Sequence, residues 1–180
     1  MGTLGGRDAI DLVVNGARLA EAPPSDLRQL ERPLRPLALA TSPILLRGPS
    51  AECLHVIKRL HALSRRAEHP LRICEQEADA ASLLALTSPE PPALEAVAGT
   101  WALFGVHLWP LERQILLNNA LEILDQHRLA GDLQHEHIPR VLVAAPSLGD
   151  MASGGGPGDF APELLARLSF FKLELNPRFP

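Results

Sequence analysis

The chain has 180 residues, 46% of them hydrophobic and only 4% aromatic, so a single domain with a largely aliphatic core is expected. A formal net charge of −4 argues against non-specific binding to nucleic acid, which needs a basic surface. The two cysteines, Cys53 and Cys74, are too few for a disulfide framework. No apolar run has the length of a membrane span, and the N-terminus lacks the basic-then-apolar order of a signal peptide. We therefore expect a cytoplasmic protein without a nucleic-acid or membrane partner.

Residues 1–24 are expected to form an N-terminal extension with a flexible start and one short strand. The alternation in Ile10-Asp11-Leu12-Val13-Val14, closed by an Asn15-Gly16 turn, predicts that strand. Pro23-Pro24 marks the boundary with the main domain, residues 25–180, which we expect to open with a short helix at Ser25-Asp26.

Within residues 25–180, predicted strands alternate with predicted helices. The strands fall near 43–47, 70–74, 100–106, 139–145 and 170–175, and the helices near 52–66, 76–86, 110–127 and 161–168. The glycine-rich segment 146–159 is predicted to be a mobile loop. The alternation indicates an α/β fold with three layers, in which helices cover both faces of a mostly parallel sheet.

The segment 110–127 has the most regular helical pattern. Pro110 suits the first turn of a helix. Six apolar residues follow at a spacing that places them on one face: Leu111, Ile115, Leu116, Ala120, Ile123 and Leu124. We expect this face to be buried.

A degenerate phosphate-loop sequence follows the first predicted strand of the main domain. The pattern G-x-x-x-x-G-K-[ST] uses backbone N–H groups to hold phosphates and a lysine to neutralise them. Here the first glycine is Gly48 and Ser50 lies inside the loop, but Cys53 replaces the second glycine and Leu54 replaces the lysine. Leucine cannot pair with a phosphate, so the pattern indicates a nucleotide site that has lost its function.

The rest of the chain resembles the central AAA+ domain of sigma-54-dependent activators, the bacterial enhancer-binding proteins. The resemblance covers residues 26–176 and rests on pieces that occur in the family's order: residues 44–50 for "VLITGES", 57–67 for the "A-x-x-I-H-x-x-S-x-R-A" helix end, 70–74 for "PFVAINC", 99–106 for "GTLFLDEI", 108–124 for "LPLELQAKLLRVLQ", 128–131 for "FRRVGG", 140–147 for "VRVIAATN" and 160–168 for "FREDLYYRL". It implies a P-loop NTPase-like fold, the large subdomain of an AAA+ protein.

The chain departs from this family at the positions that carry out the family's nucleotide chemistry. Phe104 and Gly105 occupy the positions of the acidic pair that would hold Mg²⁺ and polarise water, and Ser147 occupies that of the sensor asparagine. Of the two arginines that the family presents to a neighbouring subunit, only Arg167 remains. The interval between Leu86 and Gly99 is too short for the sigma-contacting "GAFTGA" hairpin, and the helical lid is absent. The resemblance thus implies a truncated, degenerate AAA+ domain that is not an enzyme and holds no cofactor or metal.

Three other patterns carry weaker functional interpretations. His135-Glu136-His137 supplies too few ligands for a typical zinc site and suits a solvated loop. Cys53 and His55 lack an orienting acid, so nucleophilic catalysis is not favoured. Arg167 is equally suited to a helix ion pair with Glu163.

The favoured hypothesis is a non-catalytic regulatory protein that binds a protein partner, as inhibitor, escort or adaptor of an enzyme or of an AAA+ activator. The alternatives are a residual nucleotide sensor without hydrolysis and a remnant of a transcription regulator. The candidate partner-binding residues are Ile10, Leu12 and Val13 in the extension and Leu54 and Phe104 at the former nucleotide face, because exposed apolar surface and unpaired strands attract other proteins.

Overall fold

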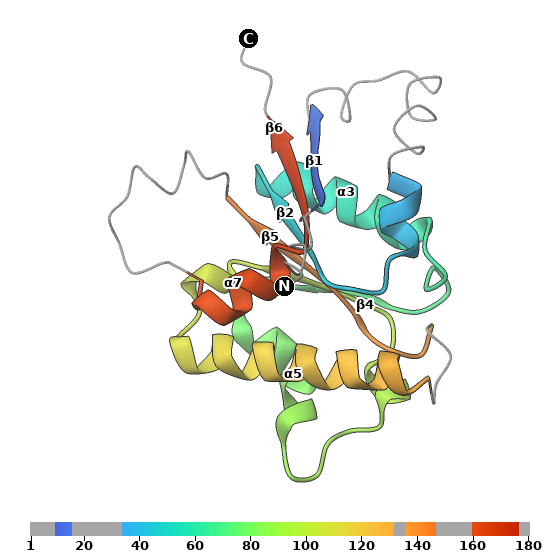
Figure 1. Cartoon of the computed structure of the whole chain (residues 1–180), viewed down its shortest axis with the longest axis vertical. Helices are drawn as coiled ribbons and strands as arrows, with labels where there is room; N and C mark the ends of the chain where they lie inside the picture. Colours follow the sequence, from blue (N-terminus) through green and yellow to red (C-terminus); the bar gives the residue numbers. More distant parts are fainter. Residues whose placement is uncertain (1–9, 16–33, 132–135, 147–159, 177–180) are drawn as a thin grey trace, which may run out of the picture.

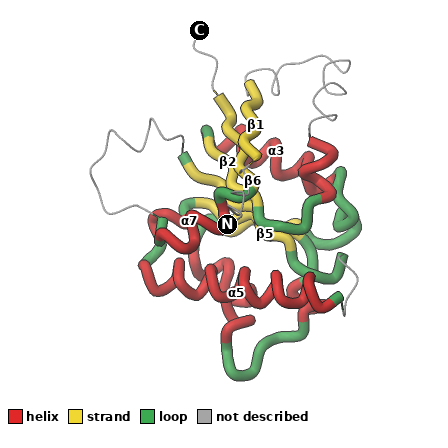
Figure 2. Tube along the Cα trace, in the orientation of Figure 1, coloured by secondary structure: helices red, strands yellow, loops and turns green. Residues whose placement is uncertain are grey.

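A computed structural model describes residues 10–15, 34–131, 136–146 and 160–176. Its centre is a sheet of six parallel strands (Figures 1 and 2). The strands are β1 (Ile10–Asn15), β2 (Ile44–Arg47), β3 (Leu71–Cys74), β4 (Thr100–Phe104), β5 (Arg140–Ala145) and β6 (Phe171–Asn176).

The strand order is β1-β6-β2-β5-β4-β3, so after β2 the chain crosses to the edge strand β3, returns through β4 and β5 to the side of β2, and then adds β6 on the other side of β2. β2 pairs with β5 on one side, where Ile44 lies opposite Leu142, and with β6 on the other, where Leu45 lies opposite Lys172. In such a sheet, a ligand site is expected beyond the carboxyl ends of the strands at the point where the order reverses. That point lies at the end of β2, directly before the degenerate phosphate-loop sequence.

Helices cover both faces of the sheet, with α3 on one side and α5 and α7 on the other (Figure 1). The α-helices are α3 (Ser50–Ala62), α4 (Ala81–Leu84), α5 (Leu111–Ala130) and α7 (Pro162–Leu168), and residues 34–39 are also helical. Short 3₁₀ helices lie at η1 (Glu77–Ala80), η2 (Ala85–Thr87), η3 (Leu94–Val97) and η4 (Val106–Leu108). None of the described helices is both long enough and apolar enough to cross a membrane.

Two separate hydrophobic cores result from the alternation of side chains along the strands. Ile44 and Leu46 of β2 pack toward α3 and the helix at 34–39, while Leu45 packs toward α5 and α7. The sheet therefore separates two helical layers, and the expected three-layer α/β fold with a parallel sheet is confirmed.

The expected inner face of α5 is wrong for two of its residues. Leu111 and Ile115 are 61% and 46% exposed. The side of α5 that packs on the sheet is one step further round the helix, and its buried residues are Gln114, Leu117, Ala120, Leu121 and Leu124. Gln114 lies on this face because its amide is used, with Nε2 donating to the carbonyl of Trp109 and Oε1 accepting from the N–H of Ala161.

Other boundaries also differ from those expected. The helix predicted over 76–86 is divided into η1, α4 and η2, and β4 ends at Phe104 because Gly105 turns the chain with a φ of 67°. The expected helix at Ser25-Asp26, the Asn15-Gly16 turn and the loop 146–159 lie wholly or largely outside the described residues.

Candidate functional site

The segment after β2 does not form a phosphate-binding loop. α3 begins at Ser50, with Pro49 in the cap position, and the N–H of Cys53 already donates to the carbonyl of Pro49 at 2.9 Å. Residues 50–53, which would wrap a phosphate in a working loop, are therefore the first turn of a helix. The N–H of Cys53 is thus used inside the helix, and the segment lacks the extended loop that forms a phosphate cradle.

Gly48 is explained by packing. Its φ is 151°, and a Cβ atom placed on it would lie 2.8 Å from the Cβ and the carbonyl oxygen of Leu175 in β6. Its N–H donates to the carbonyl of Ala145 at 3.0 Å. The glycine thus lets the chain pass between β5 and β6 on its way to α3.

Cys53 and His55 do not form a catalytic pair. Cys53 is fully buried in the core beneath α3, with its Sγ 3.6 Å from the carbonyl oxygen of Gly48, whereas His55 is exposed. Burial, and next the neighbouring carboxylate of Glu52, raise the pKa of the Cys53 thiol to about 12. A thiol with this pKa is not a nucleophile near neutral pH.

The former nucleotide position is a cavity of about 360 Å³ at the carboxyl edge of the sheet. Its lining comes from the start of α3 and the ends of β3 and β4: Ser50, Ala51, Leu54, Ile73, Glu75, Phe104 and Gly105. The structure thus brings together four of the residues picked out from the sequence, namely Ser50, Leu54, Phe104 and Gly105. None of the described lining residues is basic, and Glu75 adds a negative charge where a phosphate would need a positive one.

Phe104 has a second role beside the cavity. It is partly buried and packs against the core between α3 and the sheet. The position of the family's Mg²⁺-binding carboxylate is therefore filled by a ring that supports the fold.

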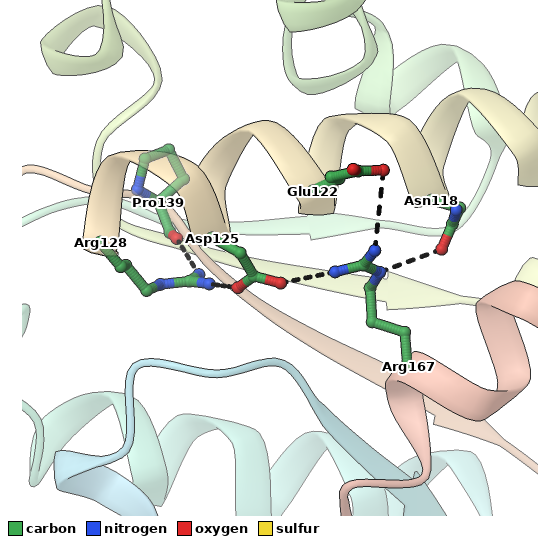
Figure 3. A network of polar contacts seen from close by, with 6 residues as sticks. All are labelled: Asn118, Glu122, Asp125, Arg128, Pro139 and Arg167. Carbon is green, nitrogen blue, oxygen red and sulfur yellow. Dashed lines mark hydrogen bonds and ion pairs between the residues drawn. The ribbon is translucent and has the colours of Figure 1, made fainter. Parts of the chain in front are cut away.

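Arg167 lies away from this cavity, between α7 and α5. Its Nε donates to Asn118 Oδ1 at 3.0 Å, one terminal nitrogen donates to Asp125 Oδ2 at 2.6 Å, and the other lies 3.9 Å from Glu122 Oε2 (Figure 3). Asp125 also pairs with Arg128, which reaches the carbonyl of Pro139 at 3.4 Å. The partners of Arg167 are thus on α5, and Glu163 of its own helix is not among them.

The remaining candidates are placed as follows. Ile10, Leu12 and Val13 belong to β1, which pairs with β6 of the same chain and so is added to this chain's own sheet. Ser147 and His135 lie outside the described residues. Among the residues that the structure describes, no cluster of three or more histidine, cysteine or carboxylate side chains could hold a metal ion.

Four exposed apolar side chains on β3, η4 and α5, one of them in the cavity lining, were missed from the sequence. Ile73 is 42% exposed, Leu108 is 68% exposed, and Leu111 and Ile115 are exposed on α5. A Cβ placed on Gly105, in the cavity lining, would lie 3.9 Å from Leu108 Cδ1. We call Ile73, Leu108, Leu111 and Ile115 the apolar rim. In the sequence each of them resembled a core residue, because only the packing of α5 and the short η4 decides that they face outward.

Solved structures with similar folds support the architecture described above. NtrX from Brucella abortus in complex with ATP is 25% identical with a TM-score of 0.54, covering 83% of this chain and 36% of the NtrX chain. NtrX in complex with ADP is 24% identical with a TM-score of 0.56, covering 89% of this chain and 37% of that one. The P-loop NTPase domain of the sigma-54 transport activator from E. coli is 15% identical with a TM-score of 0.50, covering 88% of this chain and all of that one.

No protein-family model and no curated protein matches the sequence. The structural similarities confirm that the described domain resembles the AAA+ domain of sigma-54 activators. The chain spans only about a third of the length of the NtrX chains, so the similarity concerns this one domain.

Proposed function

We propose that the chain is a non-catalytic AAA+-like regulatory domain, working in the cytoplasm, that binds another protein and acts as inhibitor, escort or adaptor of an enzyme or of an AAA+ activator. The observation that carries this proposal is the conversion of the phosphate loop into the first turn of α3, above a cavity lined by Leu54, Ile73 and Phe104. The fold is retained while its phosphate-binding geometry is replaced by apolar surface.

The charges at this edge oppose a nucleotide. Glu52 lies in the first turn of α3 and Glu75 is an exposed member of the cavity lining. A phosphate group in this cavity would meet the carboxylate of Glu75, with leucine in place of the lysine that would offset it. This weakens the alternative of a residual nucleotide sensor, although NtrX, which has the same fold, was solved with ATP and with ADP.

The apolar rim supports a protein partner. Ile73, 42% exposed, lines the cavity, Leu108, 68% exposed, lies next to Gly105 of the lining, and Leu111, 61% exposed, follows at the start of α5; exposed apolar surface commonly marks an interaction site. Because Glu75 is part of the same lining, the partner segment that fits is an apolar side chain next to a lysine or arginine. The apolar side chains would then bury the apolar group while the Glu75 carboxylate attracts the base.

Calorimetry with Mg-ATP tests the loss of nucleotide binding. We expect no saturating isotherm up to millimolar ATP. A saturating isotherm in the micromolar range would support the nucleotide sensor and reject the present proposal.

A pair of matched variants tests the partner surface. The tagged protein is purified from its native host, and the co-eluting protein is identified by mass spectrometry. Leu108→Asp combined with Leu111→Asp should abolish its recovery, whereas Leu129→Asp, at an 88% exposed position near the opposite end of α5, should not. All three positions are exposed, so each change should alter the free energy of unfolding by only about 0.5 kcal/mol. Recovery of the same partner with the double variant would place the interface elsewhere.

A further inference from the structure

A second cavity, of about 490 Å³, lies at the amino-terminal edge of the sheet, opposite the former nucleotide position. Its lining includes Thr41 and Ser42, directly before β2, Phe170, directly before β6, and the side chains of Asp125, Arg128 and Arg167. The cavity is therefore independent of the site discussed above, and its chemistry is polar and cationic.

Positive charge exceeds negative charge around this cavity. Arg128 and Arg167 share the carboxylate of Asp125, with one oxygen bonded to each (Figure 3). Glu122 adds only a 3.9 Å contact from a side chain that is 56% exposed. The two guanidinium groups are thus neutralised largely by the single carboxylate of Asp125. Each oxygen of that carboxylate is already bonded to one of the two arginines.

Two more arginines lie behind Arg128. Arg140 is fully buried, and its guanidinium donates only to backbone carbonyls, those of Leu37 and Ala38, among the described residues. Burial, together with the charges of Arg66 and Arg128, lowers the pKa of Arg140 to about 9, and burial lowers that of Arg66 to about 10. Both remain charged at neutral pH, so they add to the positive potential at Arg128, while the carboxylate of Glu136 acts in the opposite direction on Arg66.

Several hydrogen-bond donors in the lining are unused. The hydroxyl groups of Thr41 and Ser42 make no hydrogen bond to any described residue. The Arg128 side chain is only 8% exposed, and its Nε is buried without an acceptor in the described part of the chain. Two half-buried hydroxyl groups and one buried guanidinium N–H beside positive charge are suited to an oxyanion, which accepts several hydrogen bonds at once.

The edge of the cavity is apolar. Phe170 is 41% exposed and its ring packs edge-on against Phe171, with ring centroids 5.0 Å apart, which holds it in place beside the arginines. We propose that this cavity binds a small phosphate monoester, with its phosphoryl group held by Thr41, Ser42, Arg128 and Arg167 and its apolar or aromatic ester group against Phe170. The proposal does not depend on the partner-binding function.

Calorimetry and thermal unfolding of the full chain test this site, with inorganic phosphate and phenyl phosphate as probes and chloride at matched ionic strength as reference. We expect saturable binding of both probes, with phenyl phosphate the tighter. At a concentration ten times its Kd, either probe should raise Tm by about 3–6 °C. The two probes distinguish a site for free phosphate, which would not discriminate between them, from a site for an aryl or alkyl ester.

Matched variants locate the binding. Thr41→Val combined with Ser42→Ala should raise the Kd for both probes at least about tenfold, since hydrogen bonds to a charged group are lost. Phe170→Ala should remove only the preference for phenyl phosphate. Ser50→Ala, which removes a hydroxyl from the other cavity, should change neither Kd. The proposal is overturned if phosphate binding is not saturable, if phenyl phosphate binds no more tightly than phosphate, or if the Thr41/Ser42 double variant binds like the wild type.

Discussion

Gly48 lies where the chain leaves β2 and passes β6, with a φ of 151° that residues with side chains rarely adopt. Gly48→Ala would place a methyl group 2.8 Å from the backbone and Cβ of Leu175. We expect this change to lower the free energy of unfolding by about 2–5 kcal/mol, through backbone strain and overpacking together. Urea unfolding followed by circular dichroism measures it.

Gly131→Ala is the matched control. Gly131 ends α5 with a φ of 70°, but a Cβ there meets nothing within 4 Å. The alanine at position 131 is therefore strained only by the left-handed backbone conformation, which should lower the free energy of unfolding by about 1–2 kcal/mol. Equal losses in the two variants would show that contact with β6 is not what requires a glycine at position 48.

The two cysteines should be unreactive in the folded protein. Burial raises the pKa of Cys53 to about 12 and that of Cys74 to about 11, with Glu52 and Asp79, respectively, as the next contributions. A thiol reagent at pH 8 should therefore modify them only as fast as the protein unfolds, and rapidly in denaturant. Labelling of Cys53 in the folded state at the rate of a free cysteine would contradict the burial of this residue.

At the scale of elements, one carboxylate joins the main ion pairs at the contact between α5 and α7. Asp125 pairs with Arg167 of α7 and with Arg128, whose side chain is 8% exposed. Asp125→Asn removes this shared counter-charge while keeping the shape of the side chain, and leaves Arg167 with only the 3.9 Å contact to Glu122 as an ion pair. Because Asp125 and Arg167 are partly solvated, we expect a loss of about 1–3 kcal/mol rather than the larger value of a fully buried pair.

Glu122→Gln provides the comparison on the same helix. Its carboxylate is 56% exposed and lies 3.9 Å from Arg167, so its removal should change the free energy of unfolding by no more than about 0.5 kcal/mol. Denaturant titration of Asp125→Asn and Glu122→Gln measures the free energy of unfolding of both variants. Equal effects would mean that the network is a surface feature rather than the link between α5 and α7.

At the scale of the whole molecule, we expect a monomer or small oligomer, and not a hexameric ring. AAA+ rings are held together partly by nucleotide between subunits. Here residues 50–53 are helical and Arg167 is bound to α5 of its own chain. Light scattering behind a sizing column at micromolar concentration measures the mass, and a stable six-subunit species would contradict this prediction.

Much of this architecture could be predicted from local patterns. The runs 43–47 and 139–145 correspond to β2 and β5, and the alternation at 10–16 to β1. These patterns are set by the spacing at which apolar side chains recur, and a short stretch of chain shows that spacing without any tertiary contact. The replacement of the phosphate-loop lysine by Leu54 and of the acidic pair by Phe104 and Gly105 was likewise visible without a structure.

The parts that could not be predicted all depend on contacts between distant segments. The inner face of α5 was misjudged because Leu111 and Ile115 fit a helical stripe as well as Leu117 and Leu121 do. The partners of Arg167 are on α5, more than forty residues away, so no neighbouring residue indicated them. The cavity with Thr41, Arg128 and Phe170 joins three segments and has no signature in any one of them.

The sequence by itself thus determined the fold class and the replacement of the family's lysine and acidic pair by Leu54, Phe104 and Gly105, because periodicity and residue type act locally. Tertiary structure alone decided that α3 extends to Ser50, that β1 completes this chain's own sheet, and that two unlike cavities lie at opposite edges of that sheet. The physical reason is that burial and charge pairing are properties of groups brought together from different segments. Which side chains remain exposed, and which charges share a partner, is settled only when the layers pack.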